Sequence, residues 1–207
     1  NNVANGTKKM NTNSVMSSPN GASNNLGNYM NAPISMKMNM HMFGGMYAPS
    51  DNLTFMIMTS YQEKEMTQQR MPMAGGSRFN VNSSGFGDTR ISTLINIFNN
   101  NLTKTHIGTG LSLPTGSVDQ RDTTPASSNT RLGYSMQNGT GTYDALFFLN
   151  NINKFGKLKI GEQLLYKKTL SENNSKNYKY GDVFELNLWS SYRWIENISS
   201  SIRINYN

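Results

Sequence analysis

Methionine is the residue type that stands out in this chain, because ten of its 14 methionines lie between Met36 and Met73. Thioethers are soft ligands that suit Cu(I), and imidazole is a compatible partner. If the segments on either side of Pro49–Asn52 form a hairpin, His41 comes diagonally opposite Met58 on the face that also carries Met56. These residue types therefore suggest a soft-metal contact at His41, Met56 and Met58, with an interior simply filled by apolar side chains as the alternative.

Alternation within the first of these segments predicts which face each residue takes. Lys37, Asn39 and His41 alternate with the methionines of 36–42, and polar side chains are expected to avoid lipid. We therefore expect the methionine row to face lipid, where it would serve as flexible apolar cover.

A second group of side chains could line a path for a small solute. Its members are polar or aromatic and alternate with apolar residues: Arg90, Lys104, His106, Asp144, Glu185, Trp189, Arg193 and Arg203. Charged side chains that face the interior of a barrel tune its ion preference. Structural ion pairing is the alternative for the charged members, and an isolated interior histidine such as His106 is more often a hydrogen-bonded filler.

The composition argues against most other functions. There is no cysteine, so disulfides and thiolate chemistry are excluded, and neither of the two histidines has an acid nearby in register to build a hydrolase triad. No phosphate loop, zinc spacing or dinucleotide motif occurs. The net charge of +7 is spread along the chain and does not indicate nucleic-acid binding. The sequence predicts no enzyme and, copper apart, no cofactor.

The elements that would position these residues are eight runs with a two-residue period, joined alternately by tight and long connections. Tight turns at one end and wide loops at the other are typical of an outer-membrane β-barrel. The sequence predicts strands at 37–47, 53–63, 88–98, 102–113, 142–151, 157–169, 182–194 and 198–206.

A soluble β-sandwich also alternates, but its strands are usually five or six residues long. Eleven residues, tilted by about 40°, cross roughly 28 Å, close to the apolar height of an outer membrane. The mean hydropathy of -0.57 does not exclude a barrel, because half of each strand faces a polar interior. A surface adhesin of sandwich type stays the alternative.

The domain organisation follows from composition and topology. Residues 1–33, rich in Asn and Ser, are predicted to be loop or disordered, and residues 34–207 to form the barrel. Tight turns face the periplasm and strand numbers are even in bacterial barrels. A rising strand should then precede the first strand and a descending one follow the last, so we expect a barrel incomplete at both ends, from a parent of ten to twelve strands.

Four motifs carry a family resemblance: Met40–Thr54, Gly85–Asp88, Ser112–Ser117 and Asn138–Asp144. From about Asn31 to Asn207, the chain resembles the outer-membrane transporter-like family named for the meta pathway of phenol degradation. The resemblance implies a monomeric barrel in the outer membrane of a Gram-negative bacterium, in contact with lipid and a small solute. Some similar proteins are associated with copper. The glycines and Pro114 of the motifs indicate architecture, with a constricting loop as the alternative.

Overall fold

The computed structural model describes residues 4–5, 8–9, 31–70 and 75–206, and it is all-β with antiparallel pairing. The elements are β1 (Ala4–Asn5), β2 (Lys8–Lys9), β3 (Asn31–Ser50), β4 (Leu53–Arg70), β5 (Arg78–Phe86), β6 (Thr89–Asn99), β7 (Thr103–Leu113), β8 (Arg121–Thr124), β9 (Ser127–Arg131), the short 3-10 helix η2 (Tyr134–Met136), β10 (Asp144–Phe155), β11 (Leu158–Thr169), β12 (Val183–Ile195) and β13 (Ile198–Tyr206). No helix among the described residues is long and apolar enough to cross a membrane.

The chain divides into two compact units, which the sequence did not predict. The first comprises 1–41, 61–87 and 117–138, and the second comprises 42–60, 88–116 and 139–207. Strands β3 and β4 contribute residues to both. Most of the predicted disordered segment 1–33 lies outside the described residues, although β1 and β2 pair with each other and β3 already begins at Asn31.

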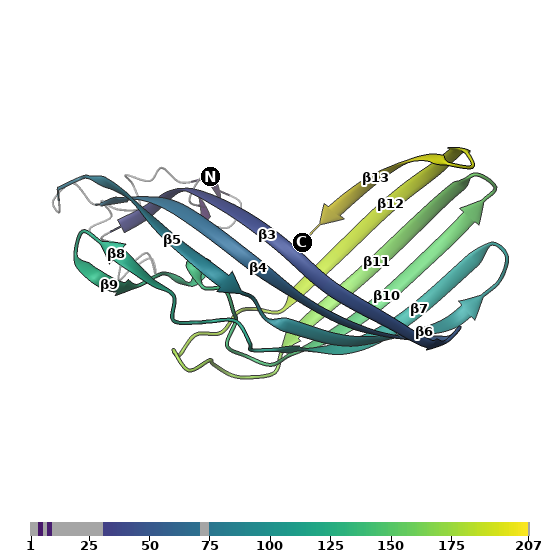
Figure 1. The fold of residues 1–207 in the computed structure, drawn as a ribbon, viewed down its shortest axis with the longest axis horizontal. Helices are drawn as coiled ribbons and strands as arrows, with labels where there is room; N and C mark the ends of the chain where they lie inside the picture. The colour runs from purple at the N-terminus through teal and green to yellow at the C-terminus, as the bar shows by residue number, and fades with distance from the viewer. Residues whose placement is uncertain (1–3, 6–7, 10–30, 71–74, 207) are drawn as a thin grey trace. The chain divides into compact units, whose positions relative to one another are not determined.

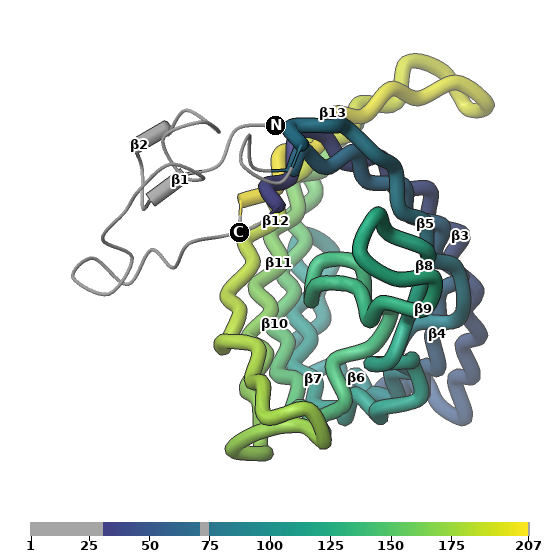
Figure 2. Tube along the Cα trace, turned by 90° about the vertical axis from the view of Figure 1, so that its left-hand side faces the viewer, coloured from purple at the N-terminus to yellow at the C-terminus, as the bar shows by residue number. Residues whose placement is uncertain are grey.

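Six of the eight predicted strands lie wholly in the second unit and β3 and β4 lie partly in it, and the strand order is β13-β12-β11-β10-β7-β6-β4-β3. Strands β6, β7 and β10 to β13 run side by side as one curled sheet (Figure 1, Figure 2). Short turns join β6 to β7, β10 to β11 and β12 to β13 in hairpins. The prediction of a partial antiparallel barrel of about eight strands is confirmed.

The pairing register sorts the side chains of the second unit into two faces. Opposite residues share a face, and one face carries Ile107 against Leu149, and Phe147 against Tyr166. Many of these apolar side chains are exposed, among them Phe184 at 55% and Ile204 at 64%. Glu162 also lies on this face, opposite Leu188, as its place in the alternation predicts.

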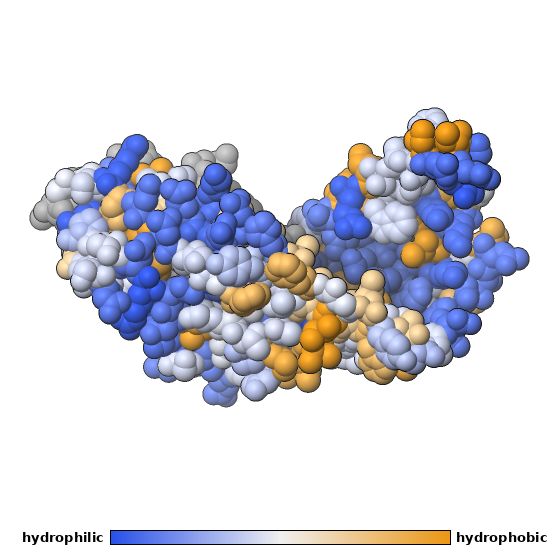
Figure 3. Space-filling view, in the orientation of Figure 1, coloured by the Kyte–Doolittle hydropathy of each residue, from blue (hydrophilic) through white to orange (hydrophobic). Residues whose placement is uncertain are grey.

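Counting outward from the predicted tight turn between 194 and 198 puts Trp189 opposite Arg203, Leu188 opposite Ile204 and Trp194 opposite Ile198, and the first two pairs are confirmed. A bulge between Arg193 and Ile195 changes the predicted pairing of Trp194. Apolar side chains gather on the turn that follows, where Trp194, Ile195 and Ile198 are all exposed (Figure 3).

Register was predicted less well in the second hairpin. Counting outward from the predicted turn at 99–101 puts Thr93 opposite Ile107, but Thr93 pairs with Thr109, which is a shift of two residues on the same face. The turn has three residues as predicted, but it lies one residue further along the chain, at 100–102, where the Asn100 carboxamide accepts hydrogen bonds from the backbone of Leu102 and Thr103. A bulge between Asn96 and Phe98 then alters the offset again.

The first unit is built where the sequence predicted a long loop. Strand β4 continues to Arg70 and pairs with β5, so that Met66 lies opposite Val81. Both are buried together with Leu132 and Met136 of the second long connection. Phe79 and Val81 alternate with asparagines, a pattern that could have indicated β5.

Lys64 is a buried cation at this core. Its side chain is 8% exposed, and its Nζ donates to the carbonyl oxygens of Ser135 (3.2 Å) and Gln137 (2.5 Å). Burial lowers the pKa of Lys64 below its ordinary value of 10.5, because the charged form loses its hydration.

Lys64→Met is expected to remove a rise of stability with pH. Between the lowered folded pKa and 10.5, the unfolded chain binds more protons at Lys64 than the folded chain does, so the free energy of unfolding increases with pH. Urea midpoints of both proteins, measured between about pH 8 and pH 10.5, would separate this contribution from other titrating groups. Two parallel pH profiles would contradict it.

Candidate solute path on the polar face

The second unit brings all eight predicted path residues to the face opposite the apolar one. Arg90 pairs with Ser112, and Ser112 pairs with Asp144. His106 pairs with Asn150, two residues from Lys104 opposite Ile152. The remaining pairs on this polar face are Leu165 with Glu185, Trp189 with Arg203, and Arg193 with Ser199.

A row of amides crosses the polar face. Asn96, His106, Asn150, Gln163, Asn187 and Asn205 lie opposite one another in turn across six strands. The Asn187 carboxamide donates to Gln163 at 3.4 Å, and the Oδ1 atom of Asn96 is buried with no protein hydrogen-bond partner. His106 is therefore one member of a polar row, and the sequence alone predicted no such row because its members come from six strands.

Positive charge gathers on the polar face toward the tight turns. Lys154 lies opposite Lys159, and Lys159 lies opposite Ser191. Five cations share this end of the face: Lys104, Lys154, Lys159, Arg193 and Arg203. None of them forms a salt bridge with a residue that the structure describes.

The two predicted acids lie at the other end of the face, toward the long loops. Asp144 is 1% exposed, accepts a hydrogen bond from the Thr142 hydroxyl at 3.0 Å and forms an ion pair with Lys167 at 3.4 Å. It supports the sheet and is not accessible to solute. Glu185 is half-buried opposite the buried Leu165.

Three motifs of the family resemblance meet at one carboxylate, that of Asp88. It accepts hydrogen bonds from the Gly116 amide (3.0 Å), the Thr140 amide (2.8 Å) and the Thr140 hydroxyl (2.7 Å). The backbone comes so close here that a Cβ on Gly139 would lie 2.3 Å from the Gly116 carbonyl oxygen. The three motifs therefore meet at one junction, which holds both ends of the long connection between β7 and β10 against the start of β6.

The loop between β11 and β12 is held by a second carboxylate, that of Asp182. It accepts hydrogen bonds from the Thr169 amide at 3.1 Å and the Tyr166 hydroxyl at 2.9 Å. These donors stabilise the charged form and hold the pKa of Asp182 below its ordinary value.

The methionine-bearing hairpin is arranged differently from its prediction. Met56 and Met58 lie on the polar face, opposite Ser92 and Arg90. A Cβ on Gly44 would lie 3.3 Å from Met58 Cγ, so Gly44 and, by alternation, Met42 share the face of Met58. Met42 therefore does not lie on the apolar face, and the neighbouring His41 points away from Met58.

The physical reason is a register displaced by one residue. The expected four-residue turn puts His41 on the face of Met58, whereas Gly44 lies on that face, and a one-residue slip reverses every side chain of a strand. No group of three or more His, Cys, Asp or Glu side chains suited to a metal occurs among the described residues. A copper contact at Met56 and Met58 stays a prediction, without His41.

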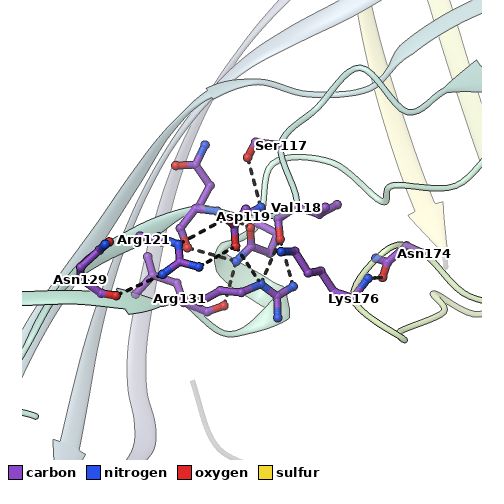
Figure 4. A network of polar contacts seen from close by, with 11 residues as sticks. Ser117, Val118, Asp119, Arg121, Asn129, Arg131, Asn174 and Lys176 are labelled. Atoms are coloured by element: carbon purple, nitrogen blue, oxygen red, sulfur yellow. Dashed lines mark hydrogen bonds and ion pairs between the residues drawn. The ribbon is translucent and has the colours of Figure 1, made fainter. Parts of the chain in front are cut away.

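The first unit has a polar network of its own. Asp119 lies between the guanidinium groups of Arg121 (3.3 Å) and Arg131 (3.6 Å), and Arg131 also donates to the Val118 carbonyl at 2.9 Å (Figure 4). Beside it is an open pocket of about 380 Å³ with both charge signs on its walls, including Lys37, Glu63 and Glu65. The sequence predicted neither feature.

No family model matches this chain, and no curated protein matches it.

Proposed function

We propose that the chain forms part of the wall of a bacterial outer-membrane barrel that lets small solutes pass along its polar face, with a preference for anions. The observation that carries this proposal is the separation of side chains across six strands, β6, β7 and β10 to β13, with exposed apolar residues on one face and polar ones on the other. A sheet with this division suits lipid on one side and water on the other.

The apolar face supports contact with lipid. It carries exposed Phe147, Tyr166 and Phe184 opposite one another on the neighbouring strands β10, β11 and β12, and soluble monomers rarely expose contiguous apolar surface of this extent. Strands β11 and β12, with 12 and 13 residues, are long enough to cross roughly 30 Å at the usual tilt.

The preference for anions is supported by the five cations near the tight turns. In a narrow passage, fixed charges of one sign attract ions of the opposite sign and exclude those of the same sign. The acids on this face do not offset them, because Asp144 is paired with Lys167 and both acids lie toward the long loops.

Planar-bilayer recording of the full chain, refolded from detergent, tests this function. We expect stable ohmic steps and, under a KCl gradient, a reversal potential that shows chloride to be more permeant than potassium. Recovery of the protein from cytosol as a detergent-free monomer, or a silent bilayer, would contradict passage through the barrel. The expected monomeric state and the absence of catalysis stay predictions.

A further inference from the structure

A hollow of about 320 Å³ lies on the polar face between β12 and β13, lined by Trp189, Ser191, Ser201, Ile202 and Arg203. Two directly opposed pairs form it, Trp189 with Arg203 and Ser191 with Ser201. An indole ring, two hydroxyls and a guanidinium thus stand together on one patch. The volume lies within the range of small-molecule sites.

The indole of Trp189 is held in place by the neighbouring strand. Gly161 lies opposite Trp189, and a Cβ atom at Gly161 would come within 2.1 to 2.3 Å of three ring atoms. Glycine is therefore required for the ring to lie over β11. A ring already fixed by packing loses little side-chain entropy when a ligand stacks on it.

The charge around the hollow is positive. Lys159 lies opposite Ser191, and Arg193 is two residues from Ser191 along β12. Glu185 is the acid of β12 on this face, four residues from Trp189, and Glu162 of β11 lies on the other face. Arg203 forms no ion pair with any described residue. An Arg guanidinium binds carboxylates in a bidentate manner.

We propose that this hollow binds a hydroxylated ring carboxylate, a sugar acid, as a station on the solute path. Arg203 holds the carboxylate, Ser191 and Ser201 bond the ring hydroxyls, and the face of the ring stacks on Trp189. A plain aromatic acid would use the indole and Arg203 but leave both serine hydroxyls without a ligand partner. The assignment rests on the proposed function and names the solute class for it.

Tryptophan fluorescence tests the assignment directly, because the chain has two tryptophans and Trp194→Phe leaves Trp189 alone. In that background, in detergent micelles, sodium galacturonate is expected to change the Trp189 emission saturably, with galactose and benzoate binding about tenfold more weakly. Arg203→Gln should weaken the binding of galacturonate about tenfold, because the charged hydrogen bonds to its carboxylate are lost. Lys168→Gln, which removes a cation from the apolar face, should leave binding unchanged.

Gly161→Val provides a second variant that keeps Arg203 and displaces the indole, and it should also weaken galacturonate binding. Unsaturable fluorescence changes, equal affinity for benzoate, or equal loss in Lys168→Gln would overturn the sugar-acid assignment. The bilayer recording separates the two proposals. If the protein conducts but does not bind galacturonate, only the sugar-acid assignment is wrong. If it binds galacturonate saturably but does not conduct, the hollow is a binding site and the proposed passage is wrong.

Discussion

Charge reversal at the tight-turn end of the polar face is expected to turn the proposed preference for anions into a preference for cations. The triple variant Lys154→Glu, Lys159→Glu and Arg193→Glu leaves two of the five cations there and introduces three carboxylates. Because the counterion population in a narrow passage follows the fixed charge, the reversal potential in a roughly tenfold KCl gradient should change sign.

The matched control is Lys168→Glu, which reverses a charge on the apolar face opposite Ala145. The reversal potential of this control variant should equal that of the unmodified protein. Lys154 and Lys159 lie directly opposite each other and repel, so a charge reversal at one of them also replaces this repulsion by attraction. Lys159→Glu alone should therefore raise the urea midpoint slightly. An unchanged sign of the reversal potential in the triple variant would place the conduction path elsewhere.

Removal of the Asp88 carboxylate is expected to cause the largest loss of stability in the second unit. Asp88→Ala leaves the Gly116 amide, the Thr140 amide and the Thr140 hydroxyl without their acceptor. Hydrogen bonds to a charged group are worth about 1.5 to 3 kcal/mol each, but water reaches the half-exposed site, so we expect a total loss of about 3 kcal/mol. Urea unfolding of the refolded protein in micelles measures it.

Two comparisons make that result specific to the junction. Asp88→Asn keeps a neutral acceptor oxygen and should lose less than Asp88→Ala. Asp51→Ala removes a carboxylate from the exposed turn between β3 and β4 and should change the free energy of unfolding by less than about 0.5 kcal/mol. Equal midpoints for Asp88→Ala and Asp51→Ala would show that the three motifs are held together by backbone contacts alone.

The sequence by itself determined strands β6, β7 and β10 to β13 and the two faces they present. Alternation is a local property, because successive side chains of a strand point to opposite sides whatever the strand pairs with. Trp189, Arg193 and Arg203 could therefore be assigned to one polar face from residue order alone. Their pairing followed because the turn after Ile195 is short and limits the possible registers.

Only the tertiary structure decided the features that depend on exact register or on distant segments. A pairing displaced by one residue from the expected register moved Met42 to the face of Met58 and turned His41 away, since one residue of slip reverses a strand. The cations near the tight turns and the amide row come from five and six strands, so their proximity exists only once the register is set.

The first unit and the Asp88 junction show the same dependence at longer range. Met66 and Val81 become buried only because Leu132 and Met136 pack on them, and that segment lies more than fifty residues further along the chain than Val81. Asp88 meets Thr140 across a similar separation. Local alternation determines which face a residue takes, whereas a loop becomes ordered through contacts that no short stretch of sequence contains.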